Sequence, residues 1–346
     1  MNASSGPRKI NTDSTTSGQP PGLVAAAVTP APNDPLVIRF LAAFSPKRNA
    51  WRTSELKAAG FDNRAVHRLV AAGQVRRIRL GTYVRGSYWD SLSRSAQDRV
   101  VISLHAIGTG SKSPRRFVYS HVSAARIHRL SLWQADTFVH VTQGSTPSST
   151  ACDSNTRIHV ATMPSSDIVE IDGKKVTSLE RTVVDCCLTM NYKQALILTD
   201  HALRIGASMD KLREAASNLS CHRGVRTLRK VLDNADGRSE SPGETLTRDL
   251  LRELFIEAPE LQYWINTRQG PYRADFAWVA QRVALEFDGR TKYFDYRPTN
   301  ETIFMERKRE IALVEAGWIV LRLEWKDLFD GLALKARILI ALNHLS

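Results

Sequence analysis

Cysteine, acidic side chains and long apolar runs are all scarce in this sequence of 346 residues. Its four cysteines, Cys152, Cys186, Cys187 and Cys221, do not have the spacing of metal ligands, so we expect reduced thiols in a cytoplasmic protein. The apolar runs are too short to span a bilayer, which argues against a membrane protein. Residues 1–33 are rich in Ser, Thr, Pro and Gly and lack the apolar core of a signal peptide, so we predict a disordered tail there.

Acidic residues are few relative to basic ones mainly in the N-terminal part of the chain. The chain has 48 Lys and Arg against 35 Asp and Glu, a net charge of +13. Residues 35–100 hold 13 basic and 4 acidic side chains, whereas residues 240–346 hold 15 basic and 17 acidic ones. This distribution indicates an anionic partner, first of all nucleic acid, that binds near the N-terminus. The length predicts two or three domains.

Residues 34–90 carry the signals of a small DNA-binding domain. Caps and glycines predict helices at about 36–44, 53–59 and 62–72, with Thr53 or Ser54 as the cap of the second, and a hairpin follows over 74–84. We predict a winged helix-turn-helix whose third helix enters the major groove and whose wing contacts phosphates. A solvated basic surface is the alternative. The side chains expected at DNA are Arg64, His67, Arg68, Arg76, Arg77 and Arg79.

Residues 91–236 mix helical and strand patterns and predict an α/β middle domain without an evident nucleophile and base. His121 and His128 are seven residues apart and could share a helix face as a zinc pair, but ordinary structural histidines are the preferred interpretation. Asp185 lies among apolar residues, so we expect it to pair with Arg181 or a helix end.

The last third of the chain places acids on neighbouring strands. Two strand-like segments, residues 272–279 and 282–287, carry Asp275 and Glu286, and Asp288 follows on the same face as Glu286. Carboxylates gathered in buried strands repel one another unless a cation joins them. We therefore predict a Mg²⁺ or Mn²⁺ site that activates water against a phosphodiester. Ion pairs of these acids with Arg273 or Lys308 are the alternative.

Four stretches, TSELKAAGF, AVHRLVAAGQVRRIRLGTYV, YSHVSAARIHRL and VTSLERTVVDCC, resemble the AbiEi family of antitoxins from type IV toxin–antitoxin systems. The resemblance covers roughly residues 38–235. It implies an N-terminal winged helix that binds DNA and represses its own operon. It also implies a following part associated with neutralising a cognate toxin protein.

The segment that follows residue 237 resembles the Vsr-like branch of the PD-(D/E)XK endonucleases, on GETLTRDLL, YRADFAW, VALEFDGRTKY and ERKREIALVEAGWIVLRLEW. The resemblance implies that Asp275, Glu286 and Asp288 bind the metal ion and that Glu244 assists from the first helix. The lysine that the family places two residues after the second acid is replaced here by Asp288. Lys292 is the nearest substitute, and Lys308 is another.

The predicted fold is therefore α+β and multidomain. It comprises a tail (1–33), a winged helix-turn-helix (34–90), a mixed α/β middle domain (91–236) and a restriction-endonuclease-like αβββαβ core (237–346). One hypothesis is a Mg²⁺-dependent endonuclease whose winged helix binds the target DNA. A second is an AbiEi-like repressor with an inactive nuclease-like tail, for which a homodimer on paired half-sites is one arrangement. A third is a tail that binds a toxin or another protein and never touches DNA.

Overall fold

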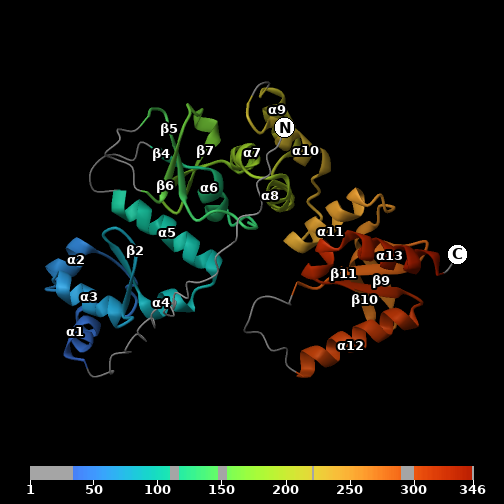
Figure 1. Cartoon of the computed structure of the whole chain (residues 1–346), viewed down its shortest axis with the longest axis horizontal. Helices are drawn as coiled ribbons and strands as arrows, with labels where there is room; N and C mark the ends of the chain where they lie inside the picture. The colour runs from blue at the N-terminus through green and yellow to red at the C-terminus, as the bar shows by residue number, and fades with distance from the viewer. Residues whose placement is uncertain (1–33, 110–116, 147–153, 220–221, 290–299, 345–346) are drawn as a thin grey trace, which may run out of the picture. The chain divides into compact units, whose positions relative to one another are not determined.

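The computed structural model describes residues 34–109, 117–146, 154–219, 222–289 and 300–344. The predicted disordered tail, residues 1–33, lies outside this range. The fold is mixed α/β, with three sheets (Figure 1). The chain forms two compact units that divide between Ser91 and Leu92. Within the described residues, no helix has the length and apolar character needed to cross a bilayer.

The first unit combines four helices with a three-stranded sheet of order β1-β3-β2. Asp34 begins the first helix by accepting a hydrogen bond from Leu36 N (2.8 Å), and Asp62 begins the third by accepting one from Ala65 N (2.7 Å). These caps fix both helix starts, as expected. The elements are α1 (Pro35–Ala43), β1 (Ala50–Arg52), α2 (Thr53–Ala58), α3 (Asn63–Ala71), β2 (Val75–Arg79), β3 (Thr82–Arg85) and α4 (Gly86–Ser91).

The start of α2 differs from the prediction. Neither Thr53 nor Ser54 caps it, because both already belong to the helix. Instead, Glu55 in the first turn accepts a hydrogen bond from Arg52 N (2.7 Å). The core beneath α2 is aromatic, and the rings of Phe40 and Trp51 meet edge to face at 5.2 Å.

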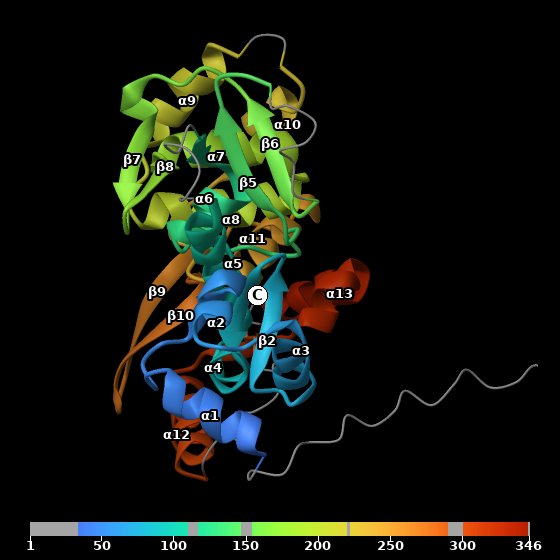
Figure 2. The same cartoon turned by 90° about the vertical axis from the view of Figure 1, so that its left-hand side faces the viewer.

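The second unit begins with a five-stranded sheet of order β6-β5-β4-β8-β7. Figure 2 shows β5 and β6 side by side, and the two strands are parallel. The elements are α5 (Arg94–Thr109), β4 (Phe117–Tyr119), α6 (His121–Ile127), β5 (Val139–Gln143), β6 (Thr156–Val160), β7 (Ile168–Ile171) and β8 (Lys174–Thr177).

A helical bundle follows, and its apolar faces form the largest cluster of buried side chains among the described residues. Adjacent Cys186 and Cys187 are both fully buried there, and burial raises the pKa of both thiols. The bundle consists of α7 (Leu179–Thr189), α8 (Tyr192–Arg204), α9 (Met209–Ser217) and α10 (Val225–Asn234).

The last part of the second unit is a four-stranded sheet of order β12-β11-β10-β9. Its elements are α11 (Pro242–Glu253), β9 (Glu260–Thr267), β10 (Gly270–Trp278), β11 (Val283–Phe287), α12 (Asn300–Glu315), β12 (Ile319–Leu323) and α13 (Gly331–Asn343). This order of helices and strands is the predicted one. The final helix begins at Gly331, and Asp330 caps it by accepting a hydrogen bond from Ala333 N (3.1 Å).

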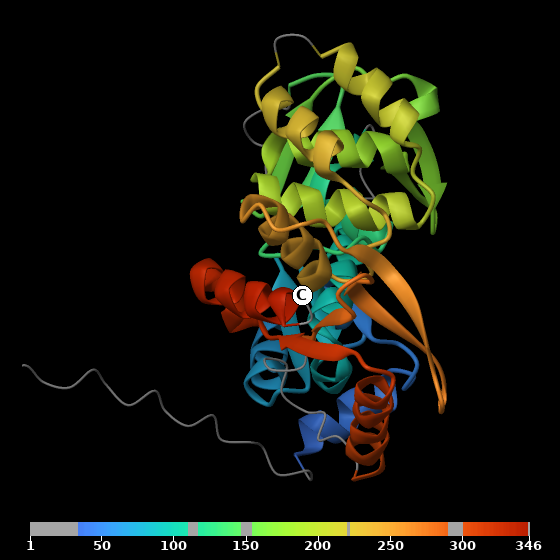
Figure 3. The ribbon, with the colours of Figure 1, turned by 90° about the vertical axis from the view of Figure 1, so that its right-hand side faces the viewer.

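Helices cover both faces of this sheet. Side chains of α11 and α13 pack on one face and those of α12 on the other. Figure 1 shows the ribbons of α11 and α13 on one side of the sheet and that of α12 on the other. Strands β9 and β10 form the long twisted hairpin, drawn in orange, that Figure 3 shows beside α12.

Asp200 of α8 ties this sheet to the helical bundle. Its side chain is 1% exposed and accepts hydrogen bonds from Asp236 N (2.8 Å) and Thr245 Oγ1 (2.8 Å). It also forms an ion pair with Arg248 Nη2 at 2.7 Å. Since Thr245 and Arg248 both belong to α11, one buried carboxylate fixes α11 against the bundle.

Candidate functional site

The acids predicted to bind metal lie on β10, at the end of β11 and in the first turn of α11. Phe276 of β10 pairs with Leu285 of β11 in an antiparallel register, and Asp275 and Glu286 are the next residues along these two strands. Asp275 Oδ2 accepts a hydrogen bond from Phe287 N (2.9 Å). The neighbouring position expected for Asp275 and Glu286 is therefore present.

Asp275 occupies the point where β10 changes its face. Tyr272 and Ala274 pack on the α12 side of the sheet, whereas Phe276 packs on the side of α11 and α13. In a regular strand, positions 274 and 276 would share a face. Opposite this point Gln262 has a φ of 54°, and its Nε2 donates to Glu244 Oε2 (2.9 Å). An irregularity of this kind re-aims a side chain, and such features gather near active sites.

Glu244 is buried beside Asp275, with 7% of its surface exposed. Its Oε2 also accepts a hydrogen bond from Glu240 N (2.8 Å). Burial raises the pKa of the Glu244 carboxyl, and the negative charge of Asp275 adds to the rise. The pKa of Asp275 is raised as well, first by burial and then by the charge of Glu240. A cation between Glu244 and Asp275 would relieve this repulsion.

Glu240 was missed from the sequence because it lies in the polar segment before α11. Its Oε2 accepts a hydrogen bond from Arg273 Nη2 at 2.7 Å. The direct ion pair of Asp275 with Arg273 is therefore replaced by an Arg273–Glu240 pair, formed across 33 residues of sequence.

Glu286 and Asp288 follow the edge shared by β11 and β12. Glu286 pairs with Arg322 in the parallel ladder, and Arg322 also forms an ion pair with Glu310 at 3.6 Å. Asp288 is the first residue after β11, and its N donates to Leu323 O of β12 (2.7 Å).

Lys292 and Lys308 were the two candidates for the cationic role. Lys292 lies outside the described residues. Lys308 is exposed on α12 and lines a hollow with Arg309 and the start of β10, Gly270 to Tyr272. The structure thus places Lys308 beside the hairpin turn.

The predicted DNA-contacting face of α3 is solvent-accessible. Arg64, His67 and Arg68 are all exposed, but Arg68 Nη2 forms an ion pair with Asp34 at 3.0 Å. On the wing, Arg76 and Arg77 are also exposed, and Arg76 forms an ion pair with Asp90 at 2.8 Å.

The outward position predicted for Arg79, near the tip of the wing, is wrong. Arg79 is only 8% exposed, whereas Leu80 is 84% exposed. The register of β2 on β3 shifts between Arg77 and Arg79, so the side chains beyond the shift exchange faces. Arg79 is therefore buried against the sheet, where an outward phosphate contact was expected.

A second group of titratable side chains lies in the five-stranded sheet. Ring nitrogens of His121, His140 and His159 all lie within 4.8 Å of one another. His121 follows β4, His140 is on β5 and His159 is on β6. Burial and the neighbouring imidazoles lower the pKa of His121 to about 2 and that of His159 to about 4.

The zinc pair of His121 with His128, the less favoured interpretation of the sequence, is not the group that forms. His128 Nε2 instead donates to Thr177 O (2.8 Å), as an ordinary structural histidine does. The expected pairing of Asp185 with Arg181 is confirmed, since Arg181 Nε donates to Asp185 Oδ1 (2.8 Å).

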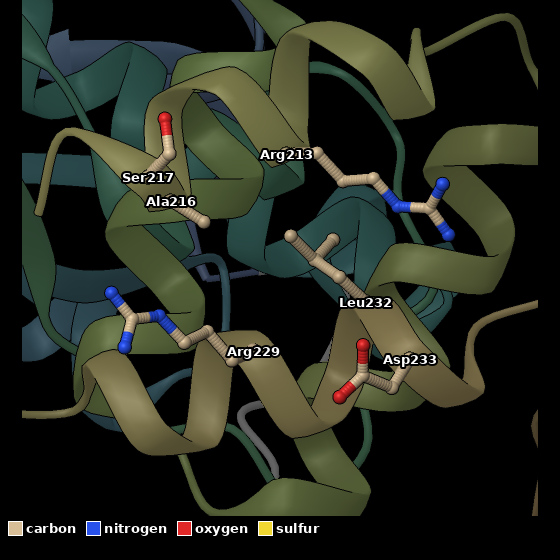
Figure 4. A pocket seen from close by; sticks show the side chains of 6 residues that line it. All are labelled: Arg213, Ala216, Ser217, Arg229, Leu232 and Asp233. Carbon is tan, nitrogen blue, oxygen red and sulfur yellow. The ribbon is translucent and has the colours of Figure 1, made fainter.

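A shallow hollow between α9 and α10 is lined by side chains that do not converge. Figure 4 shows Arg213 and Arg229 extending to opposite sides of Leu232, so their guanidinium groups do not face one ligand.

No family model matches the chain. It is 28% identical over 152 residues to two uncharacterized proteins of Mycobacterium tuberculosis, MT2308 of strain CDC 1551 / Oshkosh and Rv2248 of strain H37Rv. The match covers 43% of this chain and 55% of each relative, so the chain spans about half the length of the relatives it matches.

Proposed function

We propose that residues 237–346 form a Vsr-like PD-(D/E)XK endonuclease that requires Mg²⁺ or Mn²⁺. The observation that carries this proposal is the pair of carboxyls formed by buried Glu244 and half-buried Asp275, with half-buried Glu286 on the adjoining strand. Acids gathered from three separate elements, two of them with a raised pKa, are typical of a functional site.

Each acid has a role in this proposal. Asp275, Glu286 and Asp288 offer the hard oxygen ligands that Mg²⁺ prefers. Glu244, held by Glu240 N and Gln262 Nε2, positions the water that attacks the phosphodiester. A bound divalent cation would supply Lewis acidity at the scissile phosphate. The proposal gives Lys292 the cationic role of the family lysine.

Cleavage of supercoiled plasmid with Mg²⁺ or Mn²⁺ tests the enzyme. We expect Asp275→Asn/Glu286→Gln to abolish nicking, while Glu253→Gln, an exposed acid on the same helix as Glu244, keeps it. Calorimetric Mn²⁺ binding to the same proteins separates loss of the metal from loss of turnover. Equal nicking by all three proteins would refute the assignment of these acids.

We further propose that residues 34–90 act as the winged helix-turn-helix that binds DNA. Arg64 and Arg77 are exposed on α3 and on the wing, which are the elements expected at the groove and at the phosphates. We expect Arg64→Ala/Arg77→Ala to weaken DNA binding and to lower the salt slope by about one per lost phosphate contact. Arg226→Ala/Arg229→Ala removes the same charge from exposed positions on α10 and should have little effect.

The second candidate is an AbiEi-like repressor whose nuclease-like part does not cleave DNA. Asp288 occupies the position of the family lysine, and this substitution favours the repressor. Under this candidate, promoter binding depends on Arg64 and Arg77, and no substrate is cleaved at any metal concentration. Co-purification of the intact chain with the product of a neighbouring toxin reading frame would support the same candidate.

A further inference from the structure

The three histidines of the five-stranded sheet lie together because of strand register. On the parallel strands β5 and β6, His140 pairs with Arg157 and Thr142 pairs with His159. His140 and His159 are therefore diagonal neighbours on one face, and their ring nitrogens Nδ1 and Nε2 are 3.0 Å apart. The ring of His121 stacks on that of His159 with 3.6 Å between the centroids.

Hydrogen-bond partners outside the three-histidine group orient the rings of His140 and His121. His140 Nε2 lies 3.0 Å from Asp136 Oδ1, which leaves Nδ1 to face His159. His121 Nδ1 contacts Ser120 Oγ at 2.9 Å, and Thr142 Oγ1 donates to the same oxygen (2.7 Å). A carboxylate on the far nitrogen of a histidine is the usual way in which a metal ligand is oriented.

The backbone at His121 is strained. Its φ is 50°, in the left-handed region that residues with a side chain rarely adopt. His121 is the first residue of α6, and its ring stacks on those of His140 of β5 and His159 of β6. Strain of this kind persists where the surrounding structure imposes it, and it gathers at ligand sites.

The group opens on a cavity of about 780 Å³, whose lining includes His121, His159, Arg181 and Asp185. Asp185 is 4% exposed, and its Oδ2 makes no hydrogen bond within the part of the chain that the structure describes. That oxygen lies 3.9 Å from His121 Nδ1. A buried acceptor thus points to the place where the three rings meet the cavity.

We propose that His121, His140 and His159 bind one zinc-class divalent ion, with the fourth position open to the cavity. A zinc–nitrogen distance of about 2.0–2.1 Å puts tetrahedral nitrogens about 3.3 Å apart. His140 and His159 already meet this spacing, and a rotation of the His121 ring brings in the third nitrogen. The oxygen of Asp185 then accepts a hydrogen bond from water in the open position. Three histidines with an open position are the ligand set of catalytic zinc.

Titration of the full chain with Co²⁺, followed by Zn²⁺ competition, tests the site. The protein used carries Asp275→Asn/Glu286→Gln, so the carboxylate cluster does not contribute. We expect one equivalent of Co²⁺ to give the visible absorption of tetrahedral nitrogen ligation, and Zn²⁺ to remove it. Asp136→Asn should weaken binding roughly 10–100-fold, as loss of an outer-shell partner does, and His159→Ala should weaken it more.

His128→Gln is the matched control, because it changes a histidine of the same domain outside the group and keeps a donor for Thr177 O. Far-UV circular dichroism checks that each variant is folded, and His159 is chosen because it is only partly buried. Absence of a saturable cobalt spectrum would overturn the proposal, as would equal binding by His159→Ala or equal loss in His128→Gln.

Discussion

The carboxylates at the α11 end of the C-terminal sheet and the imidazoles of the five-stranded sheet are both buried groups of like side chains, yet they are assembled differently. Asp275 and Glu286 come from an antiparallel pair joined by a short turn. His140 and His159 come from parallel strands, and His121 comes from a helix start. The carboxylates can therefore be predicted from their spacing in the sequence. The imidazoles can be predicted only when the order of the strands is known.

The two groups also differ in what supports them. The carboxylates depend on α11, which Asp200 holds against the bundle. The imidazoles depend on hydroxyls within their own sheet, Ser120 and Thr142. This difference predicts that each group can be disturbed without the other.

The largest effect is expected from Asp200→Ala. It leaves Arg248 buried without its carboxylate, and breaking a buried ion pair from one side costs roughly 3–5 kcal/mol. Urea unfolding should show this loss, with Mn²⁺ binding by the carboxylates impaired and Co²⁺ binding by the imidazoles retained. Loss of both Mn²⁺ binding and Co²⁺ binding in a folded variant would show that the two groups are not independent.

Gly243→Ala should disturb the carboxylates by a steric route. An added Cβ would lie 1.9 Å from the ring of Phe287, so either this ring or α11 must shift, at a cost of about 1–3 kcal/mol. Gly144→Ala, where the added Cβ meets nothing within 4 Å, serves as the control in the same denaturation assay. Equal stability of the two variants would contradict the close approach of α11.

Ser120→Ala is the corresponding change at the imidazoles. It removes the acceptor of Thr142 Oγ1 and the contact of His121, and an unsatisfied buried hydroxyl costs about 1–3 kcal/mol. We expect weaker Co²⁺ binding and unchanged Mn²⁺ binding, measured on the same preparation. Unchanged Co²⁺ affinity would show that Ser120 does not position His121.

Glu240→Gln should have the smallest effect on stability, below about 1 kcal/mol, because its ion pair with Arg273 is solvent-exposed. Its effect on titration is the sharper measurement. Burial and the charge of Glu240 raise the pKa of Asp275, so removing that charge lowers this pKa. The pH at which Mn²⁺ binding is half-maximal should therefore fall. An unchanged midpoint of Mn²⁺ binding against pH would show that the charge of Glu240 does not affect the titration of Asp275.

Much of the secondary structure could be predicted because its signals are local. The caps at Asp34 and Asp62 and the order of elements after residue 237 followed from helix and strand patterns. The errors arose where the signal was not local. The register shift near Arg79 and the face change at Asp275 depend on neighbouring strands, which alternation in one strand does not reveal.

The same limit explains the site residues. The spacing of Asp275 and Glu286 in the sequence predicted both as site residues. Glu240 was not predicted, because it lies in the polar segment before α11. His140 and His159 are 19 residues apart, and their contact depends on the parallel pairing of β5 and β6 across a connecting loop. A histidine on each of two predicted strands was the available signal, and strand order was needed to read it.

The hydrogen bonds of Asp200 have a practical consequence for anyone who wishes to isolate the C-terminal part. A proteolytic fragment that began at residue 237 would carry away Thr245 and Arg248 and leave their acceptor behind on α8. Such a fragment would expose the face of α11 that now lies on the bundle, and we expect it to aggregate. A fragment that contains the carboxylates and keeps the acceptor of Thr245 and Arg248 therefore begins before α8 (Tyr192–Arg204).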